Sequence, residues 1–401
     1  MHISTTSPVD LLKQLIAIPS VNPMGQSVSG DIYYETAVTR WLVGLFEERK
    51  IPYRVQEVSP GRANVVAVCH APGATKTVML DAHQDTVPVE GMTIPPFEPT
   101  EKEGRIYGRG ACDVKGGMAA MLSAFLRLTE SEATLPNHVL LSCSCDEEAT
   151  LGGIQRLADE WSNANDSQSE PESLLHRSPD LAIIAEPTEL DVINAHKGVV
   201  RWKINVAGRA CHSSAPREGE SAIYRMGHIL RLLEEYAEQL ESERKAHPRL
   251  GSATISVGII KGGSSVNIVP EHCEIEIDRR LIPGEEGLAA QAELHQFLSS
   301  HVDFEIIFSE PWVNVPPLSD TENGLLSKVL LQTIEPVAGE RTSIAVPFGT
   351  HASPVAAAGV PAVVFGPGSI DQAHTKDEWI EVKQLEQAAE IYYQFCLAEL
   401  K

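Results

Sequence analysis

One segment near the start of the chain carries side chains suited to holding a metal ion. His83 and Asp85 lie in VMLDAHQDTVP (residues 78–88), directly after an apolar run typical of a buried strand. If the extended conformation continues, both project to the same side, where a carboxylate can hold the second ring nitrogen of a metal-bound imidazole. A lone His-x-Asp pair is more often an ordinary hydrogen bond at a strand end, so other ligands are needed.

Metal-binding side chain types recur at the ends of other predicted strands and in the loops beside them: Asp113, Glu147, Glu148, Glu186 and His374. Each has a plainer explanation. Asp113 can cap the helix that follows it, the glutamates can be turn charges, and His374 can be one of fourteen histidines without a role. Together they indicate a site, because an α/β fold gathers its functional groups at the carboxyl ends of its strands.

Two histidines and three carboxylates suit a pair of Zn²⁺ ions or a similar divalent cation. A shared carboxylate can bridge two such ions at about 3.5–4 Å, which removes the need for a larger ligand set. A further carboxylate without a metal bond would accept a proton from bound water, whose pKa such ions lower to about 7. This chemistry is metal-assisted hydrolysis.

The elements that must position these residues alternate between strand and helix. Strands are predicted near residues 63–69, 77–81, 138–145 and 181–185, with helices at 9–18, after 115 and at 152–161. This order predicts an α/β domain with a mixed, mostly parallel sheet flanked by helices. The polar, Ser-rich residues 163–178 are predicted to be a flexible surface connection.

A different order of elements begins near residue 198. Strand 199–206, helix 221–242, strands 253–260 and 266–280, helix 285–300 and strand 302–308 spell βαββαβ, the ferredoxin-like order. Alternation then resumes with a helix at 322–333, strands near 344 and 362–365, and a final helix. We therefore predict a catalytic domain of residues 1–197 and 309–401, and an inserted α+β domain of residues 198–308.

Composition excludes several classes of function. The chain has 55 acidic against 32 basic residues, a formal charge of −23, which would repel nucleic acid and anionic membrane surfaces. No apolar stretch long enough to span a membrane occurs, and the first residues lack a secretory pattern, which favours a cytoplasmic location. Seven scattered cysteines are predicted to be thiols rather than a disulfide framework.

Six separated motifs together resemble one protein family: LDAHQDTVP, GRGACDVKGG, DEEATLGG, IIAEPTELDVINAHKG, GRACHSSAP and FGPGSIDQAHTKDEWIE. This is the dizinc aminoacylase/carboxypeptidase family, of M20 metallopeptidase type, which includes acetylornithine deacetylase and succinyl-diaminopimelate desuccinylase. The resemblance runs from about Leu11 to the C-terminus. It implies a zinc-exopeptidase-like α/β fold with an inserted dimerisation domain, and hence a homodimer.

The resemblance also implies a role for each candidate residue. Asp113 would bridge two Zn²⁺ ions per subunit, with Co²⁺ or Mn²⁺ as alternatives. His83 and Glu186 would complete one metal site, and Glu148 and His374 the other. Glu147 would be the general base, and Asp85 would orient His83. His212 would stabilise the oxyanion in the partner's site. Asn267 and Arg280 would bind the substrate carboxylate. Alone, Arg280 is explained by a surface salt bridge.

The implied function is metal-dependent hydrolysis of the amide of an N-acyl amino acid, a linear amide. Within the family the likeness to acetylornithine deacetylase, an enzyme of arginine biosynthesis, is greatest. Desuccinylation, a broader aminoacylase activity or dipeptide cleavage stays open. His351 stands where those relatives tend to have an acidic residue, which bears on substrate recognition.

Two rival interpretations of the sequence are weaker. A phosphate loop at GRGACDVKGG lacks a following Gly-Lys-Ser/Thr and would point Asp113 at the phosphates. A metal-binding relative without catalysis is disfavoured by the presence of Glu147, Asp85 and His212.

Overall fold

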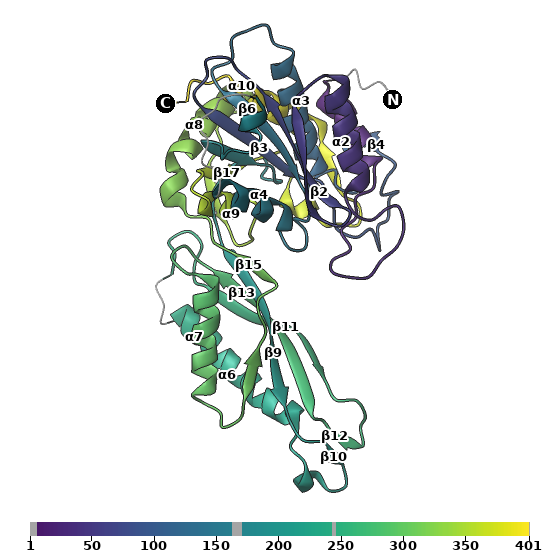
Figure 1. Ribbon diagram of the computed structural model, residues 1–401, viewed down its shortest axis with the longest axis vertical. Coiled ribbons are helices and arrows are strands. Elements are labelled where there is room, and N and C mark those ends of the chain that lie inside the picture. Colours follow the sequence, from purple (N-terminus) through teal and green to yellow (C-terminus); the bar gives the residue numbers. More distant parts are fainter. Residues whose placement is uncertain (1–5, 163–170, 243–245, 401) are drawn as a thin grey trace. The chain divides into compact units, whose positions relative to one another are not determined.

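The chain forms two compact units in the computed structural model, which describes residues 6–162, 171–242 and 246–400 (Figure 1). The first unit comprises Met1–Asn194, Asp320–Ile344 and Thr350–Lys401, and the second comprises Ala195–Ser319 with Ala345–Gly349. The second unit thus extends past residue 308 and takes a short piece of the later chain. The catalytic and dimerisation roles predicted for the two parts stay predictions.

An eight-stranded mixed sheet forms the centre of the first unit. Its spatial order is β1 (Tyr53–Ser59), β2 (Arg62–Cys69), β6 (His138–Ser144), β3 (Thr77–His83), β7 (Leu181–Ile184), β17 (Ala362–Val364), β8 (Val192–His196) and β16 (Ser343–Val346). β3 pairs in parallel with both β6 and β7, and β17 pairs in parallel with β7. These four parallel strands are adjacent, and their carboxyl ends therefore meet at one edge.

Helices cover both faces of this sheet. One face shares a core with α1 (Pro8–Ile16), α2 (Thr36–Glu48), α3 (Lys115–Thr129), α8 (Asp320–Ala338) and α10 (Val382–Cys396). On the other face α4 (Gly152–Ser162) contacts β2 and α9 (Ala352–Ala357), and α9 contacts β7 and β17 (Figure 1). β3 and β6 are buried along their whole length because both faces are covered.

The first helix illustrates how local sequence and packing agree. The Ser7 hydroxyl caps the helix by accepting from Asp10 N, and Pro8 occupies the first turn, where no backbone donor is needed. At the other end Lys115, buried in α3, donates through Nζ to the carbonyls of Leu15 (3.0 Å) and Ile18 (2.7 Å). The end of α1 is thereby fixed to the helix that follows Asp113.

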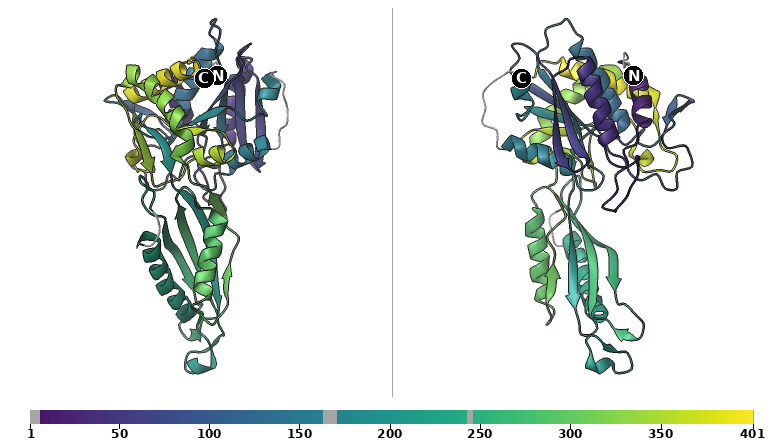
Figure 2. Two further views of the ribbon diagram at one scale, coloured as in Figure 1. Left: turned by 90° about the vertical axis from the view of Figure 1, so that its left-hand side faces the viewer. Right: turned by 45° about the vertical axis from the view of Figure 1, so that its right-hand side comes forward.

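The second unit has the ferredoxin-like topology. Its elements follow the order β9 (Gly198–Ala207), α6 (Ala222–Ser242), β11 (Thr254–Gly262), β13 (His272–Leu281), α7 (Gly287–Ser299) and β14 (Ile306–Phe308). The antiparallel sheet has the order β11-β13-β9-β14, and α6 and α7 pack on the same face of it (Figure 2). Alternate residues of β13 are buried, as a sheet covered on one side requires. Together with the mixed sheet of the first unit, this confirms the predicted fold class.

Several elements differ from the sequence-based expectation. The strand predicted over 266–280 is divided into β12 (Ile268–Val269) and β13, because Pro270 between them has no backbone N–H to donate. In the polar segment 163–178, residues 163–170 lie outside the described part of the chain. Residues Pro171–Leu174 form the short helix α5, with Leu174 and Leu175 buried, so the prediction of a flexible surface connection is wrong there.

The structure also bears on two expectations that were drawn from composition. In the described part of the chain, no helix has both the length and the apolar character needed to cross a membrane. All seven cysteines are free thiols, as predicted.

Candidate metal centre

The carboxyl ends of the four parallel strands carry most of the predicted metal ligands. His83 is the last residue of β3, Glu148 follows β6 directly after the predicted base Glu147, and Glu186 follows β7. His374 comes ten residues after β17, and Asp113 lies just before α3. The register places His83 opposite Ser144 of β6. The topology thus gathers residues that are up to 291 positions apart in sequence (374 − 83).

The ligand candidates form two clusters that share one carboxylate. In the first, donor atoms of His83, Asp113 and Glu186 all lie within 4.8 Å of one another, and His83 Nε2 is 3.1 Å from Asp113 Oδ1. In the second, the same holds for Asp113, Glu148 and His374, with His374 Nε2 3.3 Å from Asp113 Oδ2 and 3.2 Å from Glu148 Oε2. Asp113 therefore presents one oxygen to each cluster.

Asp85 is close to His83 but contacts it differently from the expectation. His83 Nδ1 lies 2.9 Å from the backbone carbonyl of Asp85 and 3.6 Å from its Oδ1. The two carboxylate oxygens instead accept hydrogen bonds from the backbone N–H groups of Glu147 and Glu148, each at 3.1 Å. The main chain of Asp85 thus holds the imidazole, and its side chain holds the turn that carries both glutamates.

Asn22 completes this arrangement, and sequence reasoning did not identify it. Its side-chain amide donates to Asp85 Oδ2 at 2.8 Å and to Asp146 Oδ1 at 2.9 Å. Burial opposes ionisation of Asp85, but His83, Asn22 and the Glu147 N–H outweigh it and hold the pKa of Asp85 below its ordinary value. The only sequence signal at Asn22 is its place in a loop of Pro, Asn and Gly residues, 19–30.

The electrostatics of the clusters suit a divalent cation. Burial and the neighbouring carboxylates, Asp113 among them, raise the pKa of Glu147 to about 8 and that of Glu148 to about 7, and they raise that of Glu186 as well. Oε1 of Glu148 is buried and has no hydrogen-bond partner in the described residues. Carboxylates that repel one another and a buried oxygen without a donor fit a site built for positive charge.

His351 lies in the interior beside this site. Its Nδ1 is 2.9 Å from Asp81 Oδ2 and 3.2 Å from the Ser144 hydroxyl, and its ring meets that of His83 edge to face at 6.2 Å. Only 1% of His351 is exposed. One ring nitrogen of His351 is thus occupied by its hydrogen bond to Asp81. The likeness to relatives that tend to have an acidic residue at this position did not indicate this contact.

The three other predicted site residues lie in the second unit. β10 (Cys211–His212) pairs with β12, and the N–H of Ser213 donates to the carbonyl of Asn267, so His212 and Asn267 lie close together. Arg280 makes a salt bridge to Asp278 at 2.7 Å, and Arg279 points to the buried side of β13. Their roles at the metal centre stay predictions.

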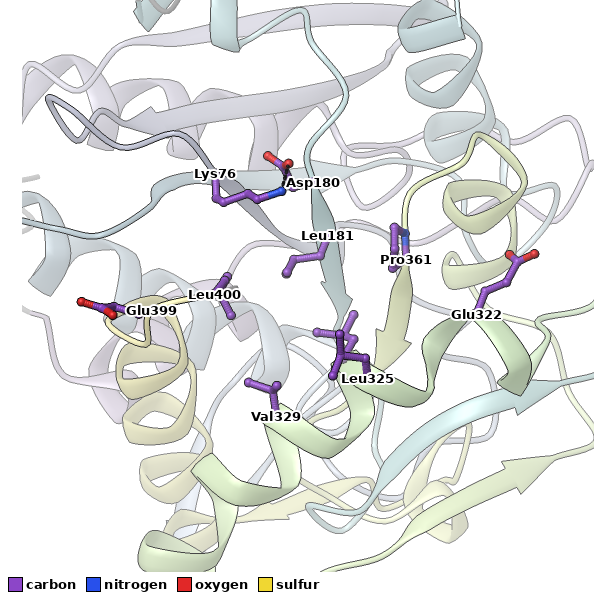
Figure 3. A pocket seen from close by; sticks show the side chains of 10 residues that line it. Lys76, Asp180, Leu181, Glu322, Leu325, Val329, Pro361, Glu399 and Leu400 are labelled. Carbon is purple, nitrogen blue, oxygen red and sulfur yellow. Dashed lines mark hydrogen bonds and ion pairs between the residues drawn. The ribbon is translucent and has the colours of Figure 1, made fainter.

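A cavity of about 400 Å³ in the first unit has no part in this chemistry (Figure 3). It is lined by Leu181, Leu325, Val329 and other apolar residues, with Lys76 and Asp180 paired at its rim at 2.9 Å. Lys76, Asp180 and Pro361 immediately precede β3, β7 and β17, so this cavity lies at the amino ends of the parallel strands. The functional edge of such a sheet is the opposite one, where the ligand clusters lie.

The fold and the paired ligand clusters define the class of the protein as a metal-dependent hydrolase. The chain belongs to the peptidase family M20/M25/M40, whose family model matches residues 79–398. Members of this family act on amide bonds, and so does this enzyme.

The relatives support this assignment along the whole chain. An acetylornithine deacetylase from Proteus mirabilis (strain HI4320) is 31% identical, covering 100% of this chain and 99% of the relative. A second acetylornithine deacetylase, from Myxococcus xanthus, is 32% identical and covers 81% of this chain and 80% of the relative.

Solved structures share the fold at lower identity. An M20 family metallo-carboxypeptidase from Sulfolobus solfataricus superposes with a TM-score of 0.76 at 19% identity, covering 97% of this chain and 98% of that one. A Bacillus subtilis protein described as a dinuclear metal-binding peptidase of the M20 family gives a TM-score of 0.64 at 16% identity, covering 98% of this chain and 97% of that one.

Proposed function

We propose that this enzyme is a dinuclear zinc hydrolase that removes the acetyl group from N-acetylornithine. The observation that carries the proposal is the sharing of Asp113 between two ligand clusters, with Glu147 next to them but in neither. His83 and Glu186 would hold one ion, and Glu148 and His374 the other. The names of the full-length relatives support the choice of acetylornithine as substrate.

The bound ions would supply Lewis acidity at the acyl carbonyl and would lower the pKa of the attacking water. The Glu147 carboxylate takes a proton from that water as the oxygen bonds to the acyl carbon. It then returns the proton to the leaving nitrogen as the carbon–nitrogen bond breaks, giving acetate and ornithine. Asp85 supports this step by holding the N–H of Glu147.

The remaining parts of the proposal concern the second unit. A homodimer, oxyanion stabilisation by His212 in the partner's site, and carboxylate recognition by Asn267 and Arg280 rest on the resemblance to the family. An acetylornithine deacetylase would serve arginine biosynthesis in the cytoplasm. Sedimentation equilibrium of the metal-loaded protein tests the dimer, and a monomer at micromolar concentration would contradict it.

Replacing Glu147 tests the proposed chemistry. We expect Glu147→Ala protein to bind two equivalents of Zn²⁺ like the wild type and to lose at least about 100-fold in kcat, the usual contribution of a general base. Metal content is measured by atomic absorption and turnover by release of ornithine. A variant that binds two metals and keeps wild-type turnover would exclude Glu147 as the base.

A substrate panel distinguishes the proposed substrate from its alternatives. Metal-reconstituted protein is given N-acetylornithine, N-succinyl-diaminopimelate and a set of dipeptides, and kcat/KM is compared. We expect N-acetylornithine to be the best substrate. Preference for the succinyl compound would make the enzyme a desuccinylase, and cleavage of dipeptides alone would make it a dipeptidase.

A further inference from the structure

The side chain of Glu378 is a completely buried carboxylate that accepts four hydrogen bonds. Its Oε1 accepts from the backbone N–H groups of Cys112 (2.8 Å) and Asp113 (2.9 Å). Its Oε2 accepts from the N–H of Gly110 (2.9 Å) and from the Arg109 guanidinium (2.7 Å). Glu378 itself is 0% exposed.

All four donors belong to one short loop, residues 109–113, which ends in the carboxylate shared by the two ligand clusters. Three backbone N–H groups of this loop converge on the same anion, as in the concave anion sites formed by successive backbone amides. Because buried N–H groups need an acceptor, the path of this loop depends on Glu378. The position of Asp113 depends on it in turn.

The same residue links two further segments that carry ligands. Glu378 follows His374 by four positions, and its own carbonyl accepts from the N–H of Gly108 at 3.1 Å. The Arg109 guanidinium, held by Glu378, also donates to the carbonyl of Pro88 at 3.0 Å. Pro88 ends the segment that contains His83 and Asp85.

We propose that Glu378 is a positioning residue for the metal centre, which holds the loops of Asp113 and His374 in the binding geometry before a metal ion arrives. The inference rests on the proposed function, because it assigns both residues to the ligand set. Glu378 touches neither the substrate nor the ions in this role. It acts through the backbone of the residues that do.

The test compares Glu378→Gln with Glu381→Gln. The first change keeps the shape of the side chain but replaces one acceptor oxygen by an N–H donor, which faces the loop donors and cannot accept from them. The second removes the same charge three residues later, where the side chain is 43% exposed and lies 3.7 Å from Arg105. Far-UV circular dichroism of the metal-free proteins establishes that each is folded.

The readouts are Zn²⁺ affinity, from titration against a competing chelator, and the visible absorption spectrum of the Co²⁺-loaded protein. For Glu378→Gln we expect affinity to fall by about 10- to 100-fold, as for other residues that orient metal ligands, and the Co²⁺ bands to shift. Glu381→Gln is expected to match the wild type in both.

Wild-type affinity and spectrum in Glu378→Gln would overturn the inference and leave the proposed function intact. A wild type that binds no Zn²⁺ would overturn both. Equal losses in Glu378→Gln and Glu381→Gln would show a general effect of charge and would also overturn the inference. If Glu378→Gln does not fold, Arg109→Lys takes its place, because it keeps the positive charge but loses the two-pronged guanidinium. We expect Arg109→Lys to weaken Zn²⁺ binding. Wild-type Zn²⁺ affinity in this variant would overturn the inference.

Discussion

At the scale of single residues, the hydrogen-bonded pair of Asp81 and His351 is sealed from solvent. We expect His351→Ala to lower the free energy of unfolding by about 3 kcal/mol, because it leaves the Asp81 carboxylate buried with the Ser144 hydroxyl but without the imidazole. In the Asp81→Asn background, His351→Ala should lower the free energy of unfolding by clearly less, since the Asp81 carboxylate is then absent. Urea denaturation of the four proteins measures this coupling, and strictly additive losses would contradict it.

A second residue-scale prediction concerns His196 in β8. It is fully buried, and this burial lowers its pKa from the ordinary 6.5 to about 4, although Nδ1 donates to the Lys197 carbonyl. The unfolded chain then binds more protons than the folded one between pH 6.5 and 4, so stability is lost as pH falls through this window.

The loss attributable to His196 is about 2 kcal/mol between pH 7.5 and pH 5. His196→Asn, whose amide can replace the Nδ1 donor without titrating, should reduce the acid sensitivity by this amount in urea melts at the two pH values. An unchanged difference between the two pH values would show that other groups cause the acid sensitivity.

Individual residues of the site differ in how far the sequence could predict them. Ligand types at strand ends identified His83, Asp113, Glu148, Glu186 and His374, which the structure brings together. The hydrogen bond from Asn22 to Asp85 joins residues 63 positions apart and leaves no local pattern in the sequence. For the same reason the direction of the Asp85 carboxylate, towards the backbone of Glu147 and Glu148, could not be predicted.

At the scale of elements, the loop before α3 requires a glycine at position 110. Its φ is +80°, and an added methyl group would lie 2.8 Å from Thr86 Cγ2 and 3.0 Å from Lys115 Cδ. Gly104 is the matched control, because its φ is +74° and nothing lies within 4 Å of an added methyl group.

Gly104→Ala should therefore cost only about 1 kcal/mol, for the left-handed conformation. We expect Gly110→Ala to cost about 2–4 kcal/mol, because overpacking is added to that conformational cost. It should also weaken metal binding, since Asp113 belongs to the same loop. The free energies come from urea denaturation and the affinities from chelator competition, and equal effects of the two changes would refute the steric argument.

Two strands that are buried along their whole length, β3 and β6, were predicted well from sequence, whereas β8, which is equally buried, was missed. β3 and β6 have continuous apolar runs with clear polar ends, so their carboxyl ends could be located. β1 was missed because most of its residues are partly or fully exposed and no apolar pattern marks it. The small sheet of β18 (Trp379–Glu381), β5 (Arg105–Tyr107) and β4 (Thr100–Lys102) was missed because three-residue strands show no periodicity.

At the scale of the whole molecule, all ligand candidates lie in the first unit, and the second unit has a hydrophobic core of its own. Zn²⁺ at about 100 times its dissociation constant should stabilise the folded state by about 2.7 kcal/mol. Hydrogen exchange should therefore slow in the peptides containing β3, β6 and residues 109–113 when Zn²⁺ is added to metal-free protein. Peptides from α6 and β13 serve as the control, and equal slowing there would contradict a local effect.

The place of β17 in the sheet has a consequence for synthesis on the ribosome. Residues 362–364 pair with β7 on one side and β8 on the other, so the last-made strand of the sheet enters between two strands made much earlier. During translation Asp113, Glu147, Glu148 and Glu186 all leave the ribosome before His374 and Glu378. The five ligand candidates can therefore come together only after His374 has been made, late in synthesis.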